Sequence, residues 1–274
     1  MRTLRQSLCA ALLGVFALSG AAAEEPMSPG GLTGEDIAEK VDGREGGDQV
    51  RQDLIMTLVD SSGAQRQRRT VYLAKDFDET SKSVIFFNSP TKLKGTAFLT
   101  NDYTEVDKDD DQWLYLPATG RSRRISSSNR GGYFLGTDFT YEDIKKQTKL
   151  SLDDFNFVYD GVETIDGIEL LVIEGEPVSE EAADELGYGK VRVAVDEVTW
   201  LAIKADYWDT NLNKLKTIRL YDIAEVQGII TAHRIIAENH KTGHKTEFLF
   251  ENVDYNTAVA EDVFTEAAMR QGLD

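Results

Sequence analysis

The sequence predicts a mainly β fold, in which one antiparallel sheet forms a barrel or half-barrel with short helices across its mouth. Three observations predict this class. From Val50 onward, runs of about five to ten residues with alternating apolar side chains are separated by turn signals, of which Asp166-Gly167 is a strong one. No helical pattern is long enough to cross between parallel strands, which argues against an α/β fold. A long antiparallel sheet must curl or close to protect its edges and its apolar face.

The amino-terminal residues 1–23 predict a cleavable signal peptide rather than a part of the fold. A short basic stretch precedes an apolar run over residues 8–18, which is too short to span a bilayer comfortably. Ala21 and Ala23 form a small-residue site, so we expect cleavage after Ala23 and a periplasmic protein. Cys9 is the only cysteine and leaves with this peptide, so the mature chain can form no disulfide.

Residues 24–34 read as a linker with several Pro and Gly residues, and residues 35–274 as a single domain. A short helix opens the domain, because Thr33 can cap it and Asp36 follows three residues on. A second short helix is expected over residues 260–270, at the end of the chain.

The predicted strands lie between these helices and are spaced as in a meander. They cover residues 54–60, 67–75, 83–88, 94–103, 112–116, 155–162, 168–176, 190–195, 199–208, 214–225, 229–239 and 245–255.

Some of these strands are apolar on both faces, notably at residues 84–87, 113–116 and 170–173. A barrel wall with one wet face does not need this, so both faces of these strands must be covered. The long insertion at about residues 118–154 contains aromatic residues and glycines, and it is the expected cover. A loop of this length is usually functional, so we interpret it as a lid.

Composition argues against several functions. The chain has 274 residues and a formal net charge of −18, so its surface repels nucleic acids and, in general, anionic bilayers. There is no Gly-x-Ser-x-Gly motif, no mature cysteine and no phosphate-binding glycine loop, so we expect no enzyme activity and no cofactor. His233, His240 and His244 are the only histidines, and the last two flank a predicted hairpin turn, so we expect no metal site.

A cluster of arginines stands out in this acidic chain, and it consists of Arg121, Arg123, Arg124 and Arg130. Arginine is suited to bidentate capture of phosphate or carboxylate. The cluster therefore predicts a site for an anionic headgroup or for an acidic partner. Pairing with the protein's own carboxylates is an equally good interpretation.

A set of aromatic residues is the candidate lining of an apolar ligand cavity. The set consists of Phe86, Trp113, Tyr115, Tyr133, Phe134, Phe139 and Trp208. For any single member, an ordinary place in the core is the better expectation.

The central segments QWLYLP (residues 112–117), RSRRI (121–125) and GTDFTYED (136–143) resemble a known family, the periplasmic outer-membrane lipoprotein-sorting proteins. The resemblance is to a branch of longer LolA-like members. The segment at residues 89–99 and the alternating β pattern also fit, so the resemblance extends over about residues 34–272.

This resemblance implies an unclosed antiparallel β-barrel of about 11–12 strands, with short helices forming a lid over an apolar concavity that receives acyl chains. It also implies a carrier that passes a lipid or lipoprotein towards the outer membrane, or to or from an RND-type (MMPL-like) exporter. Two alternatives remain open. The chain could be a periplasmic sensor or scaffold for a membrane protein, without lipid transfer, or, as a weaker candidate, an envelope hydrolase.

Overall fold

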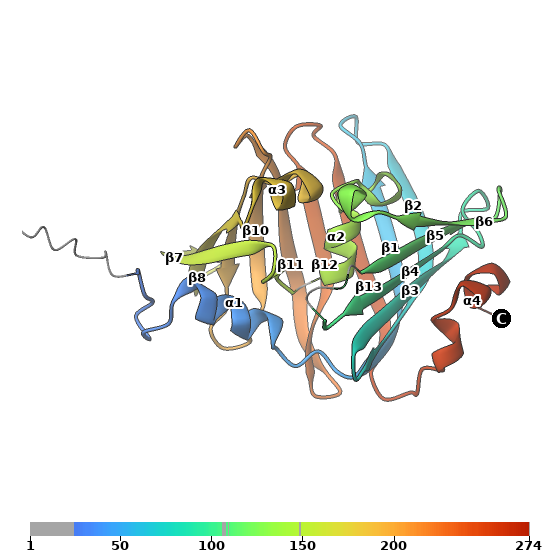
Figure 1. Ribbon diagram of the computed structural model, residues 1–274, viewed down its shortest axis with the longest axis horizontal. Helices are drawn as coiled ribbons and strands as arrows, with labels where there is room; N and C mark the ends of the chain where they lie inside the picture. The colour runs from blue at the N-terminus through green and yellow to red at the C-terminus, as the bar shows by residue number, and fades with distance from the viewer. Residues whose placement is uncertain (1–24, 106–107, 109, 148, 274) are drawn as a thin grey trace, which may run out of the picture.

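The fold is a single antiparallel sheet of thirteen strands that curls without closing (Figure 1). The computed structural model describes residues 25–105, 108, 110–147 and 149–273. The predicted signal peptide, its cleavage site after Ala23 and Cys9 lie outside the described residues. The curled but unclosed antiparallel sheet confirms the predicted mainly β, unclosed-barrel fold class. The described residues contain one or two strands more than expected, because the predicted insertion itself contains a strand, β6 (Arg121–Ile125).

The first six strands form one half of the sheet: β1 (Gln49–Val59), β2 (Gln65–Phe77), β3 (Thr80–Ser89), β4 (Ala97–Tyr103), β5 (Asp111–Leu116) and β6. The remaining seven form the other half: β7 (Phe155–Ile165), β8 (Ile168–Pro177), β9 (Lys190–Val195), β10 (Ala202–Trp208), β11 (Lys214–Val226), β12 (Ile229–Asn239) and β13 (Lys245–Asp254). The helices are α1 (Gly34–Asp42), α2 (Tyr141–Lys146), α3 (Glu180–Leu186) and α4 (Glu266–Gln271), with 3-10 turns η1 (Ser127–Asn129), η2 (Phe134–Gly136) and η3 (Glu261–Val263).

Strand order explains why the lid exists. β1 pairs with β13 in the middle of the sheet, and each half continues outward strand by strand, so that β6 and β7 are its two edges. The segment that joins them, residues 126–154, must therefore pass from one edge to the other. It does so across the inner face of the sheet, where α2 lies (Figure 1). We call residues 126–154 the lid.

The sheet is covered on both faces in its β1–β6 half. Along β3, Ile85 and Phe87 point to the inner face, where lid residues pack on them. Val84 and Phe86 point to the outer face and pack with residues from the chain end, including Met269 of α4. Side chains of a strand alternate between faces, so a doubly apolar strand requires two covers. The lid provides one cover and α4 provides the other.

The edge strand β7 is protected by α1. Glu35 Oε1 of α1 accepts a hydrogen bond from the backbone N–H of Phe157 at 2.6 Å, so this edge donor is not free to pair with another strand. Gly34 allows the close approach, since a Cβ there would lie 2.5 Å from the carbonyl oxygen of Phe157. Thr33 and Asp36 form the expected capping box at the start of this helix.

Met269 tests whether α4 is a structural cover. Its side chain is 0% exposed against the outer face, so Met269→Ala is expected to lower the free energy of unfolding by about 2–5 kcal/mol. Urea denaturation measures the change. Val198→Ala, at a side chain that is 87% exposed, is the control and should change stability by less than about 0.5 kcal/mol. Equal, small effects of the two substitutions would contradict this role of α4.

Candidate functional site

The candidate site is the inner face of the sheet together with the lid that covers it. The lid enters this face through η2, where Leu135 and Gly136 both have positive φ (47° and 77°) and turn the chain sharply. It continues into α2, whose start is fixed by a capping box between Thr140 and Asp143. Lid side chains are thereby aimed at the floor of the sheet.

Aromatic side chains of the lid fill the apolar part of the inner face. Phe134 is fully buried, with ring centroids 5.0 Å from Phe98 and 6.2 Å from Phe87. Phe139 stacks on Phe248 of β13 at 4.1 Å. One apolar pocket left beneath α2 measures about 20 Å³, which is room for about one water molecule, and a second, largely apolar pocket between α2 and strands β9 to β11 measures about 60 Å³. The lid therefore occupies the space that an apolar ligand would need.

Hydrogen bonds attach the lid loop to three strands. Arg68 of β2 donates from Nη2 to the carbonyl oxygen of Leu135 at 2.7 Å. Asn239 at the end of β12 donates to the hydroxyl of Tyr133 at 3.0 Å. Thr246 of β13 donates to the carboxylate of Asp138 at 2.7 Å. Burial raises the pKa of Asp138, so keeping its carboxylate ionised at this position costs free energy.

A buried ion pair attaches the lid helix. Lys216 of β11 is 0% exposed, and its Nζ contacts the carboxylate of Asp143 on α2. The same carboxylate accepts the backbone N–H of Thr140 at 2.6 Å and the hydroxyl of Tyr188 at 3.1 Å. Burial lowers the pKa of Lys216, while Asp143 opposes that shift. Asp143 thus caps the lid helix and neutralises the lysine at once.

A polar pocket of about 400 Å³ adjoins this apolar region, at the end of the sheet away from the lid loop. Its floor is polar because polar inner-face residues lie on two successive levels of four strands: Gln52 and Tyr72 on one level, and Ser83 and Thr100 on the next. Thr100 is buried, and its hydroxyl has no hydrogen-bond partner among the described residues.

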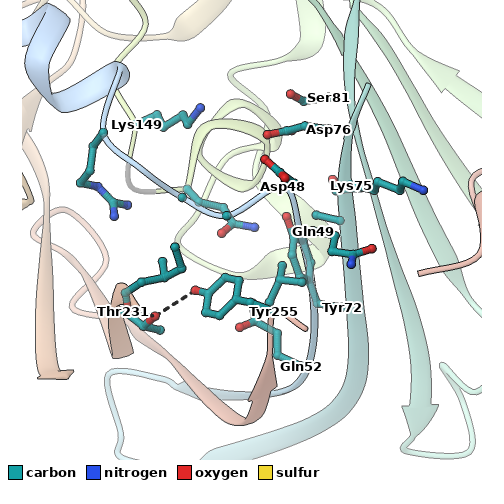
Figure 2. A pocket seen from close by; sticks show the side chains of 18 of the residues that line it. Asp48, Gln49, Gln52, Tyr72, Lys75, Asp76, Ser81, Lys149, Thr231 and Tyr255 are labelled. Atoms are coloured by element: carbon teal, nitrogen blue, oxygen red, sulfur yellow. Dashed lines mark hydrogen bonds between the residues drawn. The ribbon is translucent and has the colours of Figure 1, made fainter. Parts of the chain in front are cut away.

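Figure 2 shows Gln52, Tyr72, Thr231 and Tyr255 around this pocket, with Thr231 and Tyr255 hydrogen-bonded at 2.9 Å. The lid contributes the other wall through α2 and the residues after it, including Lys149. Tyr72 borders both the polar pocket and the apolar space under α2. The inner face is therefore amphipathic along its strands.

The structure divides the predicted aromatic set between the two faces of the sheet. Phe134 and Phe139 lie in the inner cluster, and Tyr133 lies at its rim, 42% exposed. Phe86, Trp113 and Tyr115 lie in the outer cluster with α4 instead. The reason is the alternation along β3 and β5, since Ile85 and Leu114 take the inner positions. Trp208 lies elsewhere, under the ammonium of Lys190 at 4.6 Å.

The four predicted arginines do not form one site. Arg130 pairs with Asp154 at 2.6 Å and with Glu185 at 3.1 Å, which ties the lid to itself and to α3. Arg124 pairs with Asp111 at 2.6 Å. Arg121 and Arg123 are exposed on the edge strand β6. None of the four lines the polar pocket.

Sequence reasoning missed the buried lysine and the polar pocket. Lys216 does carry a signal, because it shares a strand face with Ile218 and Leu220 and is thus a charge on an apolar face. The capping-box pattern of Thr140 and Asp143 marked the start of α2 as well. Their meeting across the sheet could not be read from either pattern alone.

Two further findings concern the described part of the chain. It holds no group of three or more His, Cys, Asp or Glu side chains placed to bind a metal ion. None of its helices has the length and apolar character needed to cross a bilayer.

One family model matches more than half of the chain. The model of a family described as "uncharacterized protein" matches residues 79–271. No curated protein matches the chain.

Several solved structures are similar over most of the chain. One, described as an outer membrane lipoprotein-sorting protein domain from Vibrio parahaemolyticus, is 27% identical with a TM-score of 0.78, covering 86% of this chain and 98% of that one. A DUF1329 family protein from Desulfovibrio piger is 26% identical with a TM-score of 0.78, covering 86% and 97%. A LolA superfamily protein from Nitrosomonas europaea shares the fold at 22% identity, with a TM-score of 0.65 and coverage of 86% and 99%.

Lys216 and Asp143 are expected to be coupled in stability. Lys216→Met leaves a buried carboxylate without its cation and should cost about 3–5 kcal/mol. Adding Asp143→Asn should recover part of this loss, because the amide oxygen can still accept from Thr140 without carrying a charge. A urea-denaturation double-mutant cycle measures the coupling. The control, Lys190→Met, breaks a partly exposed pair with Glu174 and should cost no more than about 1 kcal/mol. Additive effects of the Lys216 and Asp143 substitutions would refute the coupling.

Asp138 is expected to make stability depend on pH. Its folded pKa is raised by burial, so between the ordinary and the raised value the folded protein binds more protons than the unfolded chain. Stability then falls as pH rises through that interval. Asp138→Asn does not titrate, so its stability relative to wild type should increase from about pH 3.5 to pH 7. Denaturation midpoints at both pH values test this, with the exposed Asp78→Asn as control. A pH-independent difference for Asp138→Asn would be the contrary result.

Proposed function

Because this chain belongs to the family whose model spans residues 79–271, and its fold is that of the LolA-like outer-membrane lipoprotein-sorting proteins, we propose that it is a non-enzymatic carrier of lipid or lipoprotein acyl chains. The carrier would act in the periplasm. The acyl chains would lie on the inner face of the sheet, in the space that the lid now fills.

One observation carries this proposal. The inner face is apolar, yet its covering layer is a connecting segment fixed by hydrogen bonds and ion pairs rather than by a further strand. Phe134 and Phe139 of that segment occupy the floor as an acyl chain would. Displacing the lid would open an apolar trough, and each CH₂ group buried there contributes roughly 0.8 kcal/mol.

The polar pocket suits the other end of an amphiphile. It adjoins the apolar space at Tyr72, and its floor offers the neutral donors and acceptors Gln52, Ser83 and Thr100. A headgroup in this pocket would place its acyl chains under α2. In this proposal the headgroup lies away from the arginine cluster, which was one of the two interpretations that the sequence left open.

The direction of transfer follows the resemblance alone. Delivery towards the outer membrane, or exchange with an RND-type exporter, would both require the lid to leave and return. The lid's polar attachments suit such movement, because water can replace hydrogen bonds that are broken on opening.

A crosslink between the lid and β13 tests the proposal. The side chains of Asp138 and Thr246 are in contact, and the described chain holds no cysteine, so Asp138→Cys with Thr246→Cys should join the lid to the sheet on oxidation. We expect the oxidised protein to take up a fluorescent fatty acid at least about tenfold less well than the reduced protein, a loss of about 1.4 kcal/mol in binding. Fluorescence titration before and after reduction measures uptake.

The control pair lies on the sheet, away from the lid. Arg192→Cys with Glu174→Cys joins two residues that lie opposite one another on the neighbouring strands β9 and β8, and its oxidation should leave uptake unchanged. Uptake by the lid-crosslinked protein equal to that of its reduced form would exclude the inner face as the acyl site. No uptake by either form of the wild type would exclude the carrier itself.

A further inference from the structure

Positive charge is segregated in this acidic protein. Residues 61–75, 81–101 and 112–137 contain eleven Lys and Arg residues and no Asp or Glu, although the whole chain has a formal net charge of −18. These segments form most of β2 to β6, five consecutive strands of one half of the sheet. The arginine cluster singled out in the sequence is thus one part of a larger basic region.

Strand register brings the ends of these segments to one rim. Arg69 of β2 pairs with Ser89 at the end of β3, and Leu116 at the end of β5 pairs with Arg121 of β6. The loop from β3 to β4 lies between them and carries Lys92 and Lys94. We call the exposed cations at this end of the strands the basic rim, which consists of Arg66, Arg69, Lys92, Lys94, Arg121 and Arg123.

The basic rim has no counter-charge among the described carboxylates. Arg124, Arg130 and Arg192 all pair with carboxylates, whereas no member of the rim makes an ion pair with any carboxylate that the structure describes. Exposed and uncompensated cations of this kind are available to phosphate groups.

The rim borders the lid loop. Leu93, between Lys92 and Lys94, packs at the margin of the inner apolar cluster together with Leu116 and Leu135. Leu135 belongs to η2, the part of the lid held by Arg68. On the β2–β6 side, the basic rim therefore borders the end of the inner face that the lid loop covers.

The surroundings favour a bilayer over a protein as the partner. Protein interfaces need an apolar or aromatic centre. None of the large exposed apolar side chains of the described residues lies on β2 to β6, the strands that carry the rim; Val158, Val162 and Leu212, for example, belong to the opposite half. Long basic side chains without an apolar anchor instead match a surface of lipid phosphates.

We propose that the basic rim docks this protein on an anionic bilayer, with the lid loop facing the lipid headgroups. The net negative charge does not prevent this, because the screening length is about 10 Å at 0.1 M salt and only charges near the contact act strongly. Docking does not require an acyl chain to be bound, so the inference goes beyond the carrier function and can fail separately from it.

Vesicle flotation of the lipid-free protein tests the inference. We expect binding to phosphatidylcholine vesicles that contain phosphatidylglycerol, weak binding to phosphatidylcholine alone, and a loss of binding as salt is raised. The combined variant Lys92→Gln, Lys94→Gln and Arg121→Gln should bind on the order of a hundredfold more weakly, from roughly fivefold for each cation.

The matched control removes the same charge elsewhere. Lys40→Gln, Arg51→Gln and Lys214→Gln replace three exposed cations outside the rim, and this variant should bind vesicles as wild type does. Circular dichroism confirms that both variants are folded. Fatty-acid uptake, measured on the same proteins, separates a failure of docking from a failure of carriage.

Three results would overturn the inference: no preference for phosphatidylglycerol, equal losses in the rim and control variants, or full binding by the rim variant. Retention of an acidic protein by the rim without vesicle binding would likewise overturn it, in favour of a protein partner.

Discussion

A buried ion pair joins the lid helix α2 to strand β11. The ammonium group of Lys216 is wholly enclosed, and the carboxylate that neutralises it belongs to the lid helix through Asp143. An enclosed charge without a partner costs several kcal/mol, so the closed lid and the buried lysine depend on one another. If the lid opens as proposed, the lysine must meet water or another anion.

The second constraint is topological. An unclosed sheet has two edges, and here the chain passes from one to the other across the inner face. The lid is thus a consequence of strand order. Because both of its ends are continuous with edge strands, it can move without detaching any strand. The edge strand β7 is protected separately, because Glu35 of α1 accepts one of its backbone N–H groups.

Much of this fold is predictable from the sequence because the signals are local. Alternation along strands, the turn at Asp166-Gly167 and the capping box at Thr33 each involve a few neighbouring residues, and each predicted element is present. The site was less predictable, because it depends on which face a residue takes. Phe86 and Phe87 have the same chemistry in the sequence, yet only Phe87 reaches the inner face. On a strand that is apolar on both faces, the sequence pattern does not show which of two successive residues points to the inner face.

The central pairing of β1 with β13 has a consequence for how the chain reaches its fold. Met56 lies opposite Phe248 and Leu54 opposite Phe250, so the middle of the sheet is made from residues near the two ends of the described chain. Within each half, strands pair with their neighbours in the sequence, so the entropic cost of loop closure is low. The pairing of β1 with β13, which joins the two halves, instead closes a very long loop. Until Lys245–Asp254 is available, β1 and β12 are open edges that can recruit other chains. A chain that ends before β13 therefore loses more than one strand, because it is left with two half-sheets whose open edge strands can pair with other chains.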